Sequence, residues 1–186
     1  MLTFRDLLKM QEELNSHLDA PPPTDKQLYS AILAELGELM QSRKGEWCWW
    51  TRNGEAFQSK PRPVQVEEGD DILHFAVTGA LGRKDLSYAL ANMTGPDGLD
   101  IWEREWASTV PVAFSEILNR YALPPGPLWV VASVMLFKLC GFTREEIEAG
   151  FIATIEKNKA RWAKPELPKA SAANGWLSWA SSLLRF

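Results

Sequence analysis

The first predicted element is an amphipathic helix over about residues 4–18. Thr3, with Asp6 three positions further on, forms an approximate capping box at its start. The proline run at 21–23 ends it, because proline cannot continue a helix. The apolar residues of the segment recur three or four positions apart, as one helical face requires: Phe4, Leu7, Leu8, Leu14 and Leu18.

A second helix is predicted to begin at the next capping signal, Thr24 with Gln27, and to continue to about Met40. The segment from Arg52 to Pro63 is polar and rich in proline, so it is predicted to be a loop. A third helix is predicted from Val66 to about Leu81.

The second half of the chain also shows helical spacing. Turn signals at 92–100 and 123–127 separate predicted helices near residues 101–120 and 128–140, and Gly141 lies just past the second of them. No stretch combines period-two alternation, β-branched enrichment and hairpin turn residues. The sequence therefore predicts an all-α helical bundle without a sheet.

The last core helix is predicted to start at Thr143, which forms a capping box with Glu146, and to run to about Trp162. A linker rich in Pro and Ala and a short apolar segment follow. We therefore expect one domain, residues 1–162, and a tail, residues 163–186. The tail is expected to pack on its own core or on a partner subunit, and recruitment of another protein is the alternative.

Composition narrows the class of partner. The 186 residues are 46% hydrophobic, enough for one domain with its own core, and the net charge of −4 gives no basic surface for a polynucleotide. Cys48 and Cys140 form no disulfide framework or zinc motif, which favours a reducing, cytoplasmic compartment. Charges interrupt the apolar residues of the N-terminus, so neither a signal peptide nor a membrane span is expected there.

Two acid pairs stand out on successive predicted helices. Glu35 with Glu38, and Glu68 with Asp71, are each three positions apart and so share one helical face. Helical geometry turns both pairs partly toward the apolar stripe of their helix, whereas the neighbouring Glu67 and Asp70 are placed on the far side. The four carboxylates are expected to converge, and the alternative is that they are solvated acids on amphipathic helices.

Converging acids imply a cation. Acids turned toward a core cost several kcal/mol each unless they are paired or bind a metal. Carboxylate oxygens without nearby thiols select Mg²⁺ or Mn²⁺, and such cages leave positions for water and substrate phosphates. The pattern therefore predicts a Mg²⁺ site, with Mn²⁺ as a possible substitute.

The order of these motifs resembles a known superfamily. The residues ELGEL at 35–39, a Trp-rich segment and the pattern E-x-x-D-I-L-H-F at 68–75 resemble the all-α nucleoside triphosphate pyrophosphohydrolases, which are MazG-like and carry E-x-x-E followed by E-x-x-D. MQEELN at 10–15, Trp47-x-x-Trp50 and the late Lys157-Asn158 are similar to the dimeric all-α dUTPases, especially phage-type members. The resemblance covers roughly residues 4–162.

This resemblance implies roles for individual residues. It makes Glu35, Glu38, Glu68 and Asp71 the catalytic ligands of two or more Mg²⁺ ions. It places around the pyrimidine the residues Gln11, Asn15, Trp47 and His74, and it places against the sugar or phosphates the residues Lys157, Asn158 and Arg161. The sequence departs from the family where lysines usually follow the tryptophans, because Cys48 and Thr51 stand there.

The implied activity is Mg²⁺-dependent hydrolysis of dUTP to dUMP and pyrophosphate, with Glu35 orienting or deprotonating the attacking water. Lys157 and Arg161 are expected to offset the charge of the leaving group. A homodimer with its active site near the interface is expected, in the cytoplasm, or in the host cytoplasm if a phage encodes the chain. The alternatives are a pyrophosphohydrolase for dCTP or a modified pyrimidine nucleotide, and an inactive relative that binds nucleotides or a protein.

Overall fold

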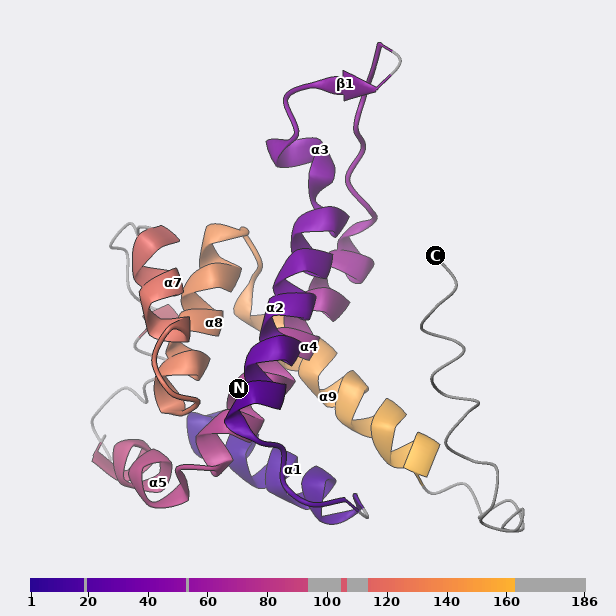
Figure 1. Cartoon of the computed structure of the whole chain (residues 1–186). Coiled ribbons are helices and arrows are strands. Elements are labelled where there is room, and N and C mark those ends of the chain that lie inside the picture. The colour runs from indigo at the N-terminus through magenta and orange to yellow at the C-terminus, as the bar shows by residue number, and fades with distance from the viewer. Residues whose placement is uncertain (19, 53, 94–104, 107–113, 163–186) are drawn as a thin grey trace, which may run out of the picture.

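The computed structural model describes residues 1–18, 20–52, 54–93, 105–106 and 114–162, and this part of the chain is built almost entirely of helices (Figure 1). The all-α prediction is confirmed. The long helices are α1 (Phe4–Ser16), α2 (Asp25–Ser42), α4 (Arg62–Leu81), α8 (Pro127–Leu139) and α9 (Arg144–Trp162). The shorter ones are α3 (Lys44–Trp47), α5 (Lys84–Met93) and α7 (Phe114–Tyr121).

Three helix starts follow from the predicted capping residues. The Thr3 Oγ1 accepts from the Asp6 backbone N–H at 3.2 Å, and the Asp6 carboxylate accepts from the Thr3 N–H at 2.9 Å. The box at Thr24 has the same reciprocal bonds. At the start of α9, the Glu146 N–H donates to Thr143 Oγ1 at 3.2 Å. These local signals place α1, α2 and α9 as predicted.

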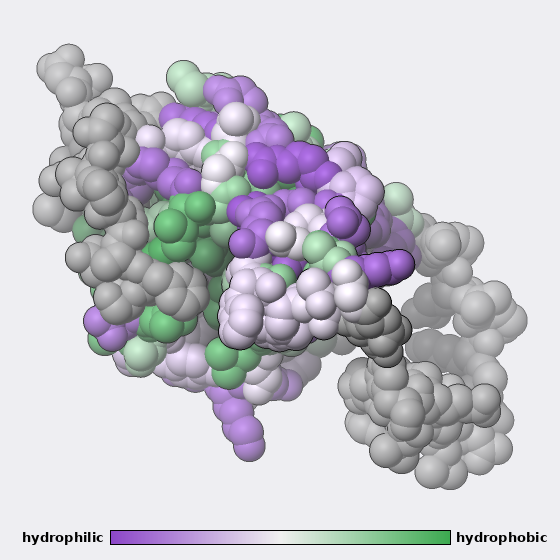
Figure 2. Space-filling model, turned by 90° about the horizontal axis from the view of Figure 1, so that it is seen from above, coloured by the Kyte–Doolittle hydropathy of each residue, from purple (hydrophilic) through white to green (hydrophobic). Residues whose placement is uncertain are grey.

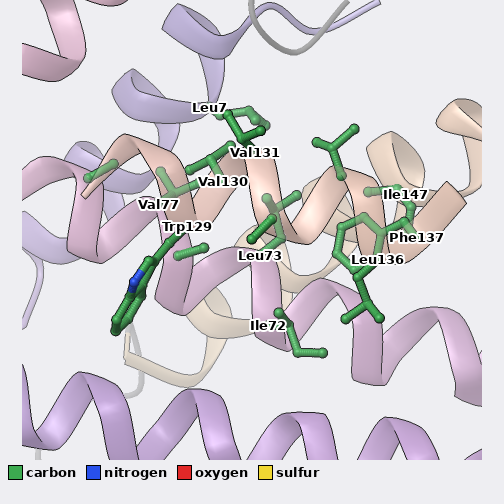
Figure 3. Packing of buried hydrophobic residues seen from close by; sticks show 14 of the residues in the cluster. Leu7, Ile72, Leu73, Val77, Trp129, Val130, Val131, Leu136, Phe137 and Ile147 are labelled. Atoms are coloured by element: carbon green, nitrogen blue, oxygen red, sulfur yellow. The ribbon is translucent and has the colours of Figure 1, made fainter. Parts of the chain in front are cut away.

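Helix α4 lies at the centre of the bundle. It packs against α2, α8, α9 and α1, so it is covered around most of its circumference. Figure 3 shows Leu73 and Val77 of α4 facing Trp129 and Phe137 of α8, and all four side chains are fully buried. Burial of such side chains stabilises the fold by about 1.5–3 kcal/mol each. The central helix therefore holds the acids of its E-x-x-D motif in a rigid frame.

Three elements differ from the sequence-based prediction. Helix α4 begins at Arg62, not at Val66, because Pro63 is compatible with the first turn of a helix. Helix α5 was not predicted. Within the predicted loop, β1 (Thr51–Arg52) pairs with β2 (Glu55–Ala56) in a two-stranded antiparallel hairpin, so the prediction of no sheet was wrong for this segment.

Other predictions fall partly outside the described residues. Of the helix predicted near 101–120, the structure describes α7 and the helical residues 105–106. The predicted tail, residues 163–186, lies outside the described part of the chain. No helix within the described residues is long and apolar enough to cross a membrane.

Residues 44–60, called the arm below, extend past the end of the bundle that is opposite to α1 and α5 (Figure 1). The arm contains α3, the hairpin and three exposed tryptophans, of which Trp49 is 88% exposed. The arm is therefore the most aromatic exposed part of the described chain.

Figure 2 shows the molecule from this end, with hydrophobic residues gathered on the side of α7 and α8.

Candidate active site

The two acid motifs meet where α2 and α4 run side by side in opposite directions (Figure 1). Glu35 of α2 and Glu68 and Asp71 of α4 each offer one carboxylate oxygen, and these oxygens lie within 4.8 Å of one another. All three side chains are half-buried. The predicted convergence is thus present for these three acids, which are called the carboxylate cluster below.

The acids of the cluster repel one another, because few positive charges lie near them. Burial, and then the charges of Asp71, Glu38 and Glu68, raise the pKa of Glu35 to about 7. Burial also raises the pKa of Glu68 and of Asp71. Among the described residues, Lys60 is the one cation in an ion pair with the cluster, 3.9 Å from Glu68. Three carboxylates whose negative charge is not balanced by nearby cations are suitable ligands for a divalent cation such as Mg²⁺.

Glu38 lies at the edge of this arrangement. Its side chain is exposed and does not belong to the group of oxygens within 4.8 Å. Its charge nevertheless raises the pKa of Glu35 and of Glu68, so it is close enough to act on both. Its role as a metal ligand stays a prediction.

Asp70 is buried, although the sequence predicted that it lies on the outer side of α4, away from the apolar stripe. Its side chain is 1% exposed, and neither carboxylate oxygen has a hydrogen-bond partner within the described chain. Burial, then the charge of Asp71, raises the pKa of Asp70 to about 9. The far side of α4 is covered by α9, where a Cβ on Gly150 would lie 1.7 Å from the Asp70 Oδ2. The outward prediction was therefore wrong for Asp70.

Glu67 does lie on the outside, as predicted. Its carboxylate accepts from Lys157 Nζ of α9 at 2.7 Å, and both side chains are at least half exposed. Exposed pairs of this kind contribute little to stability. The register predicted for the metal, Glu68 with Asp71, is thus the one that lies beside Glu35 of α2.

A cavity of about 1120 Å³ begins at Asp71 and lies between α1, the first turns of α2 and α4. Its lining includes four residues predicted to contact the substrate: Gln11, Asn15, His74 and Asn158. Cavities of this size hold small-molecule ligands. The structure therefore brings these four residues together beside one member of the carboxylate cluster.

Three of the lining residues form a hydrogen-bonded chain, called the amide relay below. His74 Nδ1 lies 2.6 Å from Gln11 Oε1, and Gln11 Nε2 donates to Asn15 Oδ1 at 2.9 Å. The His74 ring stacks on Phe151 of α9, with centroids 4.2 Å apart and planes 11° apart. Burial lowers the pKa of His74 to about 4, so its imidazole is neutral near pH 7.

The predicted cations lie on α9 near the cluster. Burial raises the pKa of Asp71, and the charges of Lys157 and Arg161 oppose that shift. Both basic side chains are exposed, so they are accessible to a phosphate group. Their position agrees with the predicted role, which stays a prediction.

Trp47, like Lys157 and Arg161, is a predicted substrate contact that does not line the cavity of its own chain. It lies on the arm and does not line the cavity. Its indole N–H donates to the Met40 carbonyl at 2.7 Å, and its ring meets Trp50 edge-on at 5.8 Å. Any contact of Trp47 with a pyrimidine therefore requires a rearrangement of the arm or a second chain.

The sequence did not single out the far end of the cavity. Thr78, Arg83 and Lys84 line it, and Lys84 forms an ion pair with Glu12 of α1. The one local feature near them is the end of α4 at Leu81. They form part of the wall and were missed because no motif marks them.

Comparison with known proteins decides the family. A family model described as dUTPase matches residues 3–164, which is most of the chain. The chain belongs to the all-α dUTPase family. It is a nucleoside triphosphate pyrophosphohydrolase that converts dUTP to dUMP and pyrophosphate. No curated protein matches the chain.

Membership of this family also bears on the carboxylate cluster. dUTPases are generally Mg²⁺-dependent, and the enzyme has a cluster of acids suited to such an ion. The cavity beside the cluster suits the nucleotide substrate that the family implies.

Proposed function

We propose that dUTP hydrolysis takes place at the carboxylate cluster, with Mg²⁺ held by Glu35, Glu68 and Asp71 and with Glu38 completing the ligand set. The observation that carries the proposal is that three carboxylate oxygens lie within 4.8 Å of one another, at a cavity that Asp71 also lines. When bound, Mg²⁺ supplies Lewis-acid chemistry that polarises phosphate oxygens and makes water a better nucleophile.

Other steps of the hydrolysis are assigned to individual side chains. Burial and the neighbouring acids raise the pKa of Glu35 to about 7, which suits a group that orients or deprotonates the attacking water. Lys157 and Arg161 offset the negative charge that develops on the leaving pyrophosphate. Asn158 lines the cavity next to these cations and contacts the sugar or phosphates.

The base is bound by the polar residues of the cavity. Gln11 and Asn15 carry amides that hydrogen-bond to a pyrimidine edge, and a pocket of this kind excludes purines by size. Trp47 joins this pocket from the arm of a partner subunit, because it lies outside the cavity of its own chain. We accordingly propose that the enzyme is a homodimer. A deoxynucleotide substrate and two free, buried thiols favour the cytoplasm as its location.

A nucleotide panel tests the reaction. The purified chain is incubated with Mg²⁺ and dUTP, dCTP, dTTP or dATP, and the products are separated by chromatography. We expect dUMP and pyrophosphate from dUTP, and no turnover in the presence of a chelator. Orthophosphate and dUDP as the only products would contradict the proposal, and so would preferential turnover of dCTP. An inactive relative would bind dUTP without converting it.

A further inference from the structure

We propose that His74 is a positioning residue that selects uracil without touching it, by holding the Gln11 and Asn15 amides in the orientation that presents N–H donors to the base. This inference rests on the proposed function, because it concerns the base at the same site. It also changes the role that the resemblance implied for His74, from a base contact to a residue that acts through Gln11.

The burial of His74 argues against direct contact with the substrate. Its side chain is 7% exposed, and its Nε2 is buried without a hydrogen-bond partner in the described part of the chain. Its Nδ1 is occupied by Gln11 at 2.6 Å. The ring is fixed from the other side by its stacking on Phe151. Neither ring nitrogen is therefore free to meet a base in the cavity.

The position of the ring proton follows from the partners of the two nitrogens. A neutral imidazole carries one N–H, and burial keeps His74 neutral because it lowers the pKa to about 4. An interaction of the ring with the Phe151 backbone opposes part of this shift, and the atom that lies 2.6 Å from Nδ1 is the Gln11 Oε1, an amide oxygen that can only accept. If Nδ1 carried no proton, its lone pair would face the lone pairs of that oxygen across this short distance. The proton therefore belongs on Nδ1, where the Gln11 Oε1 accepts it.

This tautomer sets the direction of both amides. Because Gln11 Oε1 accepts from His74, its Nε2 faces Asn15 and donates to Oδ1 at 2.9 Å. Gln11 is 4% exposed, so it has little room to turn. Asn15, which is half-buried and lines the cavity, keeps its Nδ2 donors for a ligand. With the proton on Nε2 instead, each amide would turn over and Asn15 would present its oxygen.

Donors at this position favour uracil. Uracil has carbonyl acceptors on both sides of its N3–H, whereas cytosine has an amino donor in place of one of them. An amide N–H that meets a carbonyl forms a hydrogen bond, and one that meets an amino group leaves two donors facing each other. A site that hydrogen-bonds its ligand discriminates strongly against an analogue that leaves its polar groups unpaired.

The first experiment compares the kcat/KM ratio of dUTP to dCTP in the full chain with Mg²⁺. His74→Phe keeps a ring to stack on Phe151 but removes the N–H that holds Gln11. We expect the ratio to fall by about 10-fold or more, mainly through a higher KM for dUTP, with little change in kcat. The matched control is His17→Phe, since His17 is the other histidine of the chain and lies exposed at the end of α1. An unchanged ratio in a folded His74→Phe enzyme would overturn the proposal.

A second variant covers the case in which His74→Phe does not fold. Gln11→Glu still accepts from His74 but has no N–H for Asn15, so Asn15 turns and presents its oxygen to the base. We expect the ratio to move toward dCTP. A ratio that stays with dUTP in this variant would count against the amide relay.

A spectroscopic measurement tests the inference without relying on enzyme activity. Nitrogen chemical shifts of the ¹⁵N-labelled histidine rings report the tautomer, and His17→Phe identifies the His74 signals. We expect the proton on Nδ1 at pH 7, and a proton on Nε2 would overturn the proposal. Absence of dUTP turnover in the unchanged protein would refute the proposed function, while the ring spectrum would still decide the orientation of the relay.

Discussion

At the scale of single residues, the neighbouring acids of α4 have different surroundings although they are adjacent in sequence. Glu68 belongs to the carboxylate cluster, whereas Glu67 is exposed to solvent and pairs with Lys157. Asp70 faces α9, where it has neither solvent nor a partner in the described chain. The position around the helix, not the type of residue, decides which acid is available to a metal ion.

Exchanging one carboxylate for an amide tests this assignment. We expect Glu68→Gln to lower kcat by at least about 10²-fold, as is typical when a key electrostatic contact is removed. Glu67→Gln is the matched control, and we expect nearly unchanged kcat, because it removes only an exposed ion pair. Steady-state kinetics with dUTP at saturating Mg²⁺ measures both. Equal losses in the two variants would show that the register of the site is wrong.

Asp70 leads to a prediction about stability and pH. Its pKa in the folded state is about 9, above the ordinary value of 3.8. Between these values the folded chain holds a proton that the unfolded chain has released, so stability falls as pH rises, by about 1.4 kcal/mol per pH unit. Asp70→Asn removes this group with little change in shape. We expect its melting temperature, relative to the unchanged protein, to rise progressively from pH 5 to pH 8.

The measurement is a thermal unfolding series in a chelating buffer, so that metal binding does not contribute. Groups other than Asp70 are common to both proteins and cancel in the difference. A difference in melting temperature that does not depend on pH would mean that Asp70 is ionised in the folded state.

The sequence could place Glu68 and Asp71 correctly but could not place Asp70. Helical spacing gives the angle of each residue around α4, and one apolar stripe was enough to turn Glu68 and Asp71 inward. The stripe does not reveal that α9 covers another face of the same helix, because that contact joins residues far apart in the chain. The burial of Asp70 is a tertiary effect, and the small Gly150 opposite it carries no pattern of its own.

At the scale of the elements, prediction succeeded where a local chemical signal exists. The Thr3, Thr24 and Thr143 capping boxes each mark a helix start, because the threonine and its partner satisfy backbone N–H groups directly. Helix α5 has no comparable signal. The hairpin of the arm does have one, the Asn53-Gly54 pair between its two strands, which is typical of a two-residue hairpin turn and was overlooked. The hairpin has strands of two residues, too short for a period-two pattern to show.

The packing of α4 against α9 depends on the absence of a side chain at Gly150. A Cβ there would lie 1.7 Å from Asp70 Oδ2, far inside contact distance. We expect Gly150→Ala to destabilise the fold by about 1–3 kcal/mol, as overpacking does. Adding Asp70→Ala should restore much of the loss, because the clash then has no second partner.

Chemical denaturation of the two single variants and the double variant measures this coupling. Gly37→Ala serves as the control, since a Cβ at Gly37 meets nothing within 4 Å, and alanine favours a helix over glycine. Strictly additive losses from Gly150→Ala and Asp70→Ala would contradict the direct contact.

At the scale of the whole molecule, the cavity and the arm lie at different places on one chain. Gln11 and Asn15 line the cavity, whereas Trp47 lies on the arm beyond the opposite end of α2 (Figure 1). The resemblance placed Trp47 beside the pyrimidine, and a single sequence cannot say from which subunit it comes. In the proposed homodimer, a two-fold axis that brings the arm of one chain to the cavity of its partner does so for both chains.

Mixing two defective variants distinguishes the subunit that supplies Trp47. Trp47→Ala is expected to raise the KM for dUTP, and Glu68→Gln to lower kcat by at least about 10²-fold, as above. If Trp47 acts across the interface, a heterodimer of the two variants contains one site with both an intact Glu68 and an intact Trp47. Co-refolded equimolar chains then have about a quarter of all sites intact, and these sites show the KM of the unchanged enzyme. If Trp47 acts within its own chain, or not at all on the base, no site regains that KM. Light scattering must give a mass of twice the 21.0 kDa chain before the mixture is interpreted, because monomers cannot complement each other.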